Sequence, residues 1–116
     1  MRAAALVAAV ILALGAPAGA SRPWYYPLLT LSPRVYHVFE YCVLPGQSRS
    51  TFAHPNTGDN SRYGSSGVFQ MEPVLWNRWA RRAGVHTVIW KATLYQQALV
   101  AAEVYKHDGF EPWAGC

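Results

Sequence analysis

Apolar residues recur at helical spacing in three stretches of the chain, and this pattern predicts a mainly helical fold. The first helix should begin with Ser32 as its N-cap and Pro33 at its first helical position, since both residue types are favoured there. Its apolar face is formed by Val35, Val38, Phe39 and Cys42. We expect this helix to end at about Leu44.

The other two predicted helices lie in the C-terminal half of the chain. One begins at Pro73 and ends just before Gly84, because glycine commonly follows a helix C-terminus. It should bury Leu75, Trp76 and Trp79 and expose Arg78, Arg81 and Arg82. The last helix begins at Thr93, which has the spacing of a capping box with Gln96, and ends at Gly109. Its expected core face consists of Leu94, Ala98, Ala101, Ala102 and Tyr105.

The long stretch from Gln47 to Met71 separates the first two helices and is almost free of aliphatic residues. It is rich in hydroxyl and amide side chains and in glycine, with Phe52, Tyr63 and Phe69 as flat aromatic faces. Such a stretch can be an ordinary surface loop. Its length without helical periodicity favours a ligand-binding loop, in which a short hairpin can form. The expected fold class is therefore α+β, mainly helical, with a loop-rich cleft.

The N-terminus has the composition of a secretory signal peptide. Arg2 is followed by an apolar segment, residues 3–14, and by the small-residue pattern Ala18-Gly19-Ala20. The apolar segment is shorter than the ~20 residues that span a bilayer. We therefore expect residues 1–20 to be cleaved after Ala20, which gives a secreted or wall-associated protein with no stable membrane anchor.

The cleaved chain has room for one domain, and we expect it to be a monomer. We divide it into an N-terminal extension, residues 21–34, and a folded domain, residues 35–116. Without Arg2, nine basic residues face six acidic ones, a formal charge of +3. This excess suits a polyanionic surface such as a cell wall, whereas no clustered basic patch indicates a nucleic-acid site.

Exactly two cysteines are present in this exported chain, so one disulfide between Cys42 and Cys116 is the default expectation. Closing a loop of this size stabilises a fold by about 4 kcal/mol. The alternative, Cys42 as a catalytic thiolate, has no evident histidine partner. The four histidines show no metal-ligand spacing, so neither a metal nor another cofactor is expected.

Several short motifs follow one another in a distinctive order. They are Cys42-Val43, Ser48-Arg49-Ser50, Asn56-Thr57-Gly58, the run YGSSGVFQ from Tyr63 to Gln70, Trp76, Gln96-Gln97, and Gly109-Phe110-Glu111-Pro112-Trp113 before Cys116. In this order they resemble the transglycosylase-like domain of the resuscitation-promoting factors, within the lysozyme-like superfamily. The resemblance covers nearly all of the chain from about Val35.

This resemblance implies a small lysozyme-like domain that acts on the glycan strands of peptidoglycan. It also implies the Cys42–Cys116 bridge and substrate contacts from Tyr63 and Gln70. The other candidate substrate-binding residues are Ser50, Asn60, Phe69 and Trp76. Their hydroxyl, amide and aromatic groups suit a neutral ligand that is rich in hydroxyls.

One position departs from the family that the chain resembles. Where the family carries its catalytic glutamate, this chain has Gln47, preceded by Pro45-Gly46. Glycosidic cleavage needs a carboxylic acid to protonate the leaving oxygen, and an amide cannot supply that proton. Pro45 and Gly46 should also hold Gln47 less firmly, because both residue types weaken a helix. We therefore expect impaired catalysis.

Different function classes remain open at this point. The chain is either an active muralytic enzyme, with Glu40 or Asp59 in place of the missing acid or with Gln47 as a sequence error, or a non-catalytic wall-binding module. A third class is a small secreted disulfide protein with an unrelated partner. Glu40 is more typical of a solvated helix charge, Asp59 of a turn and Glu72 of a residue at a helix N-terminus.

Overall fold

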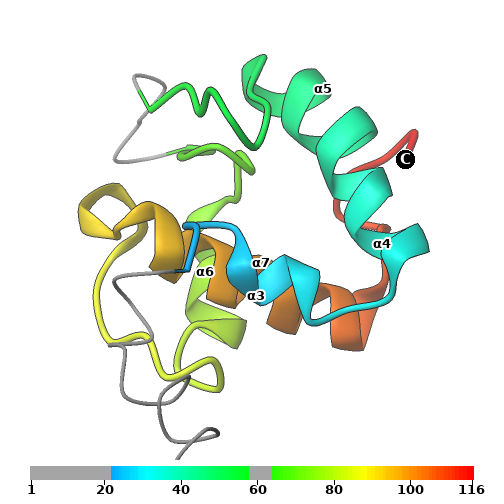
Figure 1. The fold of residues 1–116 in the computed structure, drawn as a ribbon. Helices are drawn as coiled ribbons and strands as arrows, with labels where there is room; N and C mark the ends of the chain where they lie inside the picture. Colours follow the sequence, from blue (N-terminus) through cyan, green and yellow to red (C-terminus); the bar gives the residue numbers. More distant parts are fainter. Residues whose placement is uncertain (1–21, 58–63) are drawn as a thin grey trace, which may run out of the picture.

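The computed structural model describes residues 22–57 and 64–116, which form a small, mainly helical globule (Figure 1). Its elements are α3 (Tyr26–Leu29), α4 (Pro33–Val38), the π-helical turn η1 (Phe39–Val43), α5 (Leu44–Ser48), α6 (Pro73–Trp79), the 3-10 turn η2 (Ile89–Lys91) and α7 (Leu94–Asp108). Within the described ranges no strand is assigned, and Ser66 and Met71 form an isolated antiparallel bridge. The mainly helical prediction is confirmed, whereas the strands implied by α+β are reduced to this one bridge.

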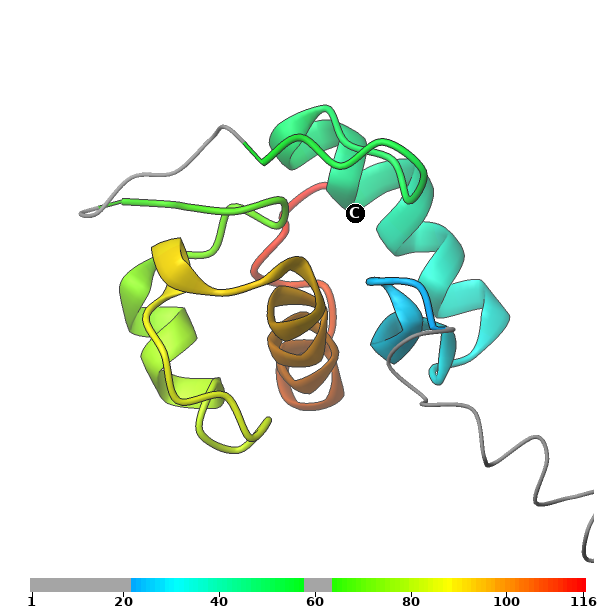
Figure 2. The same cartoon turned by 60° about the vertical axis from the view of Figure 1, so that its left-hand side comes forward.

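Helix α7 is the central element of the fold. Figure 2 shows it between α6 on one side and α3 with the α4–α5 helix on the other. The predicted capping box is confirmed, since the Gln96 N–H donates to Thr93 Oγ1 at 3.1 Å and the Thr93 N–H donates to Gln96 Oε1 at 2.9 Å. Because elements pack on both sides of α7, its buried surface is wider than the single apolar face that the sequence predicts. The buried residues are Gln97, Ala98, Val100, Ala101, Ala102 and Val104.

The first helix begins where the sequence predicts but continues past Leu44 to Ser48 as α4, η1 and α5. Its predicted N-cap is confirmed, since the Val35 N–H donates to Ser32 Oγ at 3.4 Å. The prediction that the helix ends at about Leu44 is wrong. Proline lacks an N–H and its ring crowds the carbonyl of the residue four positions back. The wider π turn, in which the Leu44 N–H reaches the Phe39 carbonyl, lies directly before Pro45 and lets the helix continue.

The segment assigned to an N-terminal extension packs into the same core as the rest of the chain. Leu28 is fully buried against α7 and its neighbours. The Trp24 indole N–H donates to the Phe52 carbonyl at 2.9 Å, and Tyr25 stacks on the Phe52 ring with centroids 4.1 Å apart. Phe52, expected to offer a face to ligand, is instead covered by these residues.

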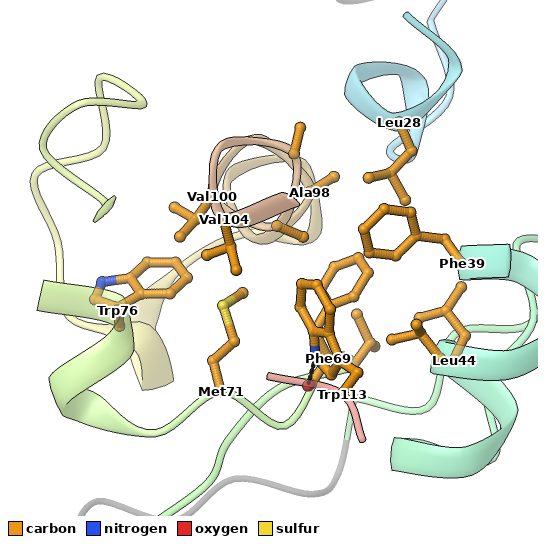
Figure 3. Close-up of a cluster of buried hydrophobic side chains, with 14 of the residues drawn as sticks. Leu28, Phe39, Leu44, Phe69, Met71, Trp76, Ala98, Val100, Val104 and Trp113 are labelled. Carbon is orange, nitrogen blue, oxygen red and sulfur yellow. Dashed lines mark hydrogen bonds between the residues drawn. The ribbon is translucent and has the colours of Figure 1, made fainter. Parts of the chain in front are cut away.

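An aromatic cluster joins the first helix, the loop region and the C-terminus (Figure 3). Phe39 is its centre, with ring centroids 5.9 Å from Phe69, 5.1 Å from Phe110 and 5.2 Å from Trp113. The Trp113 indole N–H donates to the Phe69 carbonyl at 2.9 Å, so its one polar group is satisfied inside the core.

The predicted disulfide is confirmed. Cys42 and Cys116 are bonded, with a Cα–Cα distance of 5.8 Å and a sequence separation of 74 residues. The bond fixes the last residue of the chain to η1, and Figure 1 shows the C-terminus beside that helix. It therefore encloses the whole polar stretch in one covalent loop.

Candidate functional site

A pocket of about 360 Å³ brings together three segments that are far apart in the sequence. Its lining residues are Gln47, Ser65, Gln70, Glu72, Leu75, Pro112 and Trp113. Gln47 comes from α5, Pro112 and Trp113 come from the C-terminal segment, and the other residues come from the turn before α6 or from α6 itself. The two glutamines that the sequence singles out thus share one site.

Gln47 is half-buried in the last turn of α5, and the backbone that follows is firmly bonded. Arg49 closes the helix in the left-handed conformation, with φ of 58°. The Arg49 N–H donates to the Pro45 carbonyl and the Ser50 N–H to the Leu44 carbonyl, each at 3.1 Å. These two bonds tie the backbone directly after Gln47 back to Leu44 and Pro45 in the first turn of α5.

Two buried serines connect the end of α5 to the turn that carries Gln70. Ser48 Oγ donates to the Val68 carbonyl at 2.7 Å and lies 2.6 Å from Ser50 Oγ. Because the single Ser48 proton is directed at Val68, Ser50 donates to Ser48 and accepts from the Asn56 N–H at 2.8 Å. Both hydroxyls thus serve to hold two walls of the pocket together.

Gln70 lies at the end of a tight turn between Ser66 and Met71. These two residues exchange backbone hydrogen bonds of 3.0 Å, and the Gln70 side-chain Nε2 donates to the Gly67 carbonyl at 2.9 Å. Gln70 has φ of 47°, a left-handed conformation that is uncommon for a residue with a side chain. Such strained positions cluster at functional sites, so this one adds weight to the pocket.

The turn is also fixed from behind by α7. Gln97 Oε1 accepts from the Val68 N–H at 2.9 Å, and Gln97 Nε2 donates to the Ala92 carbonyl at 3.3 Å. Gly67 has φ of 79° and lies so close to the Gln97 side chain that a Cβ atom would collide with it. A buried amide in the central helix therefore positions the turn that carries Gln70.

The C-terminal wall of the pocket is held by two independent restraints. Trp113 is almost fully buried and is bonded to Phe69, as described above. Three residues further on, Cys116 is tied to η1 by the disulfide. Pro112, which is exposed, therefore stands at a defined place on the rim.

Glu72 lines the pocket, although the sequence favours a helix-terminal role for it. It is the N-cap residue of α6, but its side chain makes no capping hydrogen bond, and the residue is exposed. Among the seven lining residues it is the only ionisable one. One signal in the sequence could have indicated this place. Glu72 directly follows Met71, which ends the turn, and directly precedes Pro73, the first residue of α6.

Several other predicted site residues lie in the core instead of the pocket. Ser50 and Phe69 have no exposed surface, so their side chains support the site from behind. Trp76 is 1% exposed, and its indole N–H donates to the Thr87 carbonyl at 2.8 Å. Trp76 borders a separate hollow of about 440 Å³ whose lining shares no residue with the first. Asn60 and Tyr63 lie outside the described residues.

Of the two alternative acids, only Glu40 falls within the described residues. Glu40 lies in η1 and is absent from the pocket lining. It lies seven positions before Gln47, which would place both on one face of a regular α-helix, but Glu40 lies inside the π turn, where that spacing does not hold. Asp59 lies outside the described residues.

Comparison of the chain with protein-family models, with curated proteins and with solved structures gave no match. Within residues 22–57 and 64–116, no three His, Cys, Asp or Glu side chains are grouped to hold a metal ion. In the same ranges, no helix combines the length and the apolar character needed to cross a membrane.

Proposed function

We propose that this chain is an exported, lysozyme-like domain that binds the glycan strands of peptidoglycan and is impaired in cleaving them. The observation that carries the proposal is the meeting of Gln47 and Gln70 in one pocket. The resemblance to the resuscitation-promoting factors assigns the catalytic position to Gln47 and a substrate contact to Gln70. That two residues 23 positions apart in the sequence line one pocket supports this proposal.

The chemistry of the pocket suits a sugar unit. Its volume of about 360 Å³ falls in the range of ligand pockets, about 300–1,000 Å³. The Gln47 amide and the Ser65 hydroxyl can each donate and accept, and neither is hydrogen-bonded to any other described side chain. Leu75 and Pro112 supply apolar surface for the C–H face of a sugar ring, with the buried Trp113 behind them.

The described lining of the same pocket holds no buried acid of the kind that cleavage requires. A glycosidase protonates the leaving oxygen with a carboxylic acid that burial keeps protonated. Gln47 has the shape of such a residue but no acidic proton. Glu72, the one carboxylate among the described lining residues, is exposed to solvent and lacks that burial. We therefore propose binding with little turnover.

Export is part of the proposal. The Cys42–Cys116 bond persists in an oxidising compartment, which supports a location outside the cytoplasm. The proposed signal peptide, residues 1–20, lies outside the described residues. After its removal the excess of basic residues favours attraction to an anionic cell wall.

Cosedimentation with insoluble peptidoglycan, run beside zymography on the same material, tests the proposal. The chain from Ser21 to Cys116 should pellet with the wall. It should produce no cleared zone in the zymogram when loaded in an amount that gives a clear zone for an active muralytic enzyme. Clearing of the zymogram would favour the enzymatic alternative. Failure to cosediment, without clearing, would favour a secreted protein with an unrelated partner and would overturn the proposal.

A further inference from the structure

We propose that Glu72 makes the pocket selective by charge, so that it holds an uncharged amino-sugar unit and disfavours one that bears an acidic group. The inference rests on the proposed function, because it names the class of sugar unit that the same site takes. It adds a specificity-determining residue that neither the helical pattern nor the resemblance assigns.

The described lining of the pocket carries a single charged group. Of its seven residues, six are amides, a hydroxyl or apolar groups, and Glu72 is the seventh. No lysine, arginine or histidine is among the lining residues that the structure describes. A ligand that enters therefore meets one negative charge and no positive charge among the described lining residues.

No described neighbour neutralises the charge of Glu72. Its side chain makes no hydrogen bond to the α6 N-terminus, and no ion pair joins it to a basic group of the described residues. The backbone is extended, with φ of −82° and ψ of 154°, and the residue is exposed. The carboxylate thus remains available to a bound molecule.

Neutral and acidic sugar units should interact differently with the Glu72 carboxylate. A sugar hydroxyl or an N-acetyl N–H can donate to the Glu72 carboxylate, and such charge-assisted bonds are stronger than neutral ones. A carboxylate on the ligand can only be repelled. Two like charges about 4 Å apart in water repel enough to weaken binding about fivefold, and by more where protein displaces water. The pocket should therefore favour the unit of the strand that carries no acidic substituent.

The basic excess of the whole chain acts at a different range. Arg78, Arg81 and Arg82 are exposed on α6 or just beyond it, and none of them lines this pocket. They can attract an anionic wall over a distance of about 10 Å at moderate salt, whereas Glu72 acts on the sugar that is in contact. General attraction and local exclusion can thus coexist in one domain.

Three ligands of equal length test the proposal by isothermal calorimetry. They are chitotetraose, its carboxymethylated derivative and its de-N-acetylated, cationic derivative. The unmodified mature chain should bind chitotetraose at least about fivefold more tightly than the carboxymethylated ligand, and the cationic ligand at least as tightly as chitotetraose. Raising the salt concentration should reduce both differences, because exposed charges are screened.

Glu72→Gln is the decisive variant, since it removes the charge and keeps the shape. It should bring the affinities for the neutral and carboxymethylated ligands within about twofold of each other, and it should weaken chitotetraose binding, because an amide oxygen accepts a weaker, neutral hydrogen bond. Glu111→Gln is the matched control, because it makes the same change in net charge at an exposed carboxylate outside the lining. It should leave the preference intact.

The two proposals fail in different ways. If none of the three ligands binds to the unmodified chain, the glycan-binding function itself is wrong, and the inference falls with it. If chitotetraose binds but the preference is missing, or survives Glu72→Gln, only the role of Glu72 is overturned.

Discussion

Gln47 differs from the glutamate of an active site by an amide in place of a carboxyl group, and at the residue scale this difference should decide turnover. Gln47→Glu is expected to raise the release of soluble product from peptidoglycan by at least about 10²-fold, because general acid catalysis contributes about 10²–10⁴-fold. Binding should change little, as expected for an interaction made mainly in the transition state. Product release is measured by chromatography of the soluble fraction.

Gln47→Ala is the control for this prediction. It removes the side chain without adding an acid and should stay inactive. Robust hydrolysis by the unmodified chain, unchanged in Gln47→Ala, would contradict the assignment. The search would then move to Glu40 and Asp59.

Two glycines offer a second test at the residue scale. Gly67 has φ of 79°, and a Cβ atom there would collide with Gln97, so Gly67→Ala should destabilise the fold by about 2–4 kcal/mol. Gly46 lies in α5 with no atom within 4 Å of an added Cβ. Gly46→Ala should instead stabilise by about 0.5–1 kcal/mol. Urea unfolding of both variants measures the difference, and equal effects would contradict the local geometry.

At the scale of elements, local signals in the sequence predicted where helices begin. Ser32 with Pro33, and Thr93 with Gln96, place two N-termini correctly because capping depends on a few neighbouring residues. The C-terminus of the first helix was missed because the π turn before Pro45 is not a local signal. The short α3 was missed for a similar reason, since its packing on α7 is a tertiary contact.

The second predicted helix is shorter in the structure than in the prediction, whereas the first is longer. It begins at Pro73 as expected, but regular α-helix ends at Trp79 and turns lead on to Gly84. Gly84 does have the positive φ, 80°, that the stop signal requires. The glycine therefore marked the end of the helical region correctly and the end of the α-helix only approximately.

Gln97 connects two elements and gives a prediction at this scale. Gln97→Met keeps the length of the side chain but leaves the buried Val68 N–H without its acceptor, which should cost about 1–3 kcal/mol. The loss should appear as a lower midpoint of urea unfolding with an unchanged slope. Glycan affinity should also fall, because the turn that carries Gln70 loses its support. Full stability in Gln97→Met would show that the turn holds itself.

At the scale of the whole molecule, the candidate site could be predicted only in part. The order of motifs singled out Gln47 and Gln70, and the fold brings them into one pocket. Ser50 and Phe69 have suitable chemistry for a ligand, but hydroxyls and aromatic rings serve equally well in a core, and both are fully buried. Glu72 was set aside because its place beside the pocket depends on how the turn before α6 folds back.

The disulfide gives the prediction that belongs to the whole molecule. It closes a loop with a sequence separation of 74 residues, so its loss should cost about 4 kcal/mol by releasing the unfolded chain. The melting temperature should fall by more than about 10 °C in reducing buffer, as measured by circular dichroism. Cys42→Ser with Cys116→Ser should melt at the same lower temperature in both buffers.

The pocket should keep its shape after the disulfide is reduced, at temperatures where the reduced chain is still folded. Trp113 keeps its burial and its hydrogen bond to Phe69, neither of which involves sulfur. Since the disulfide acts mainly on the unfolded state, chitotetraose affinity of the reduced, folded chain should stay within about threefold of the oxidised value. If affinity disappears while the helical signal is intact, the bond itself positions the C-terminal wall. Pro112 and Trp113 would then depend on Cys116 for their place in the site.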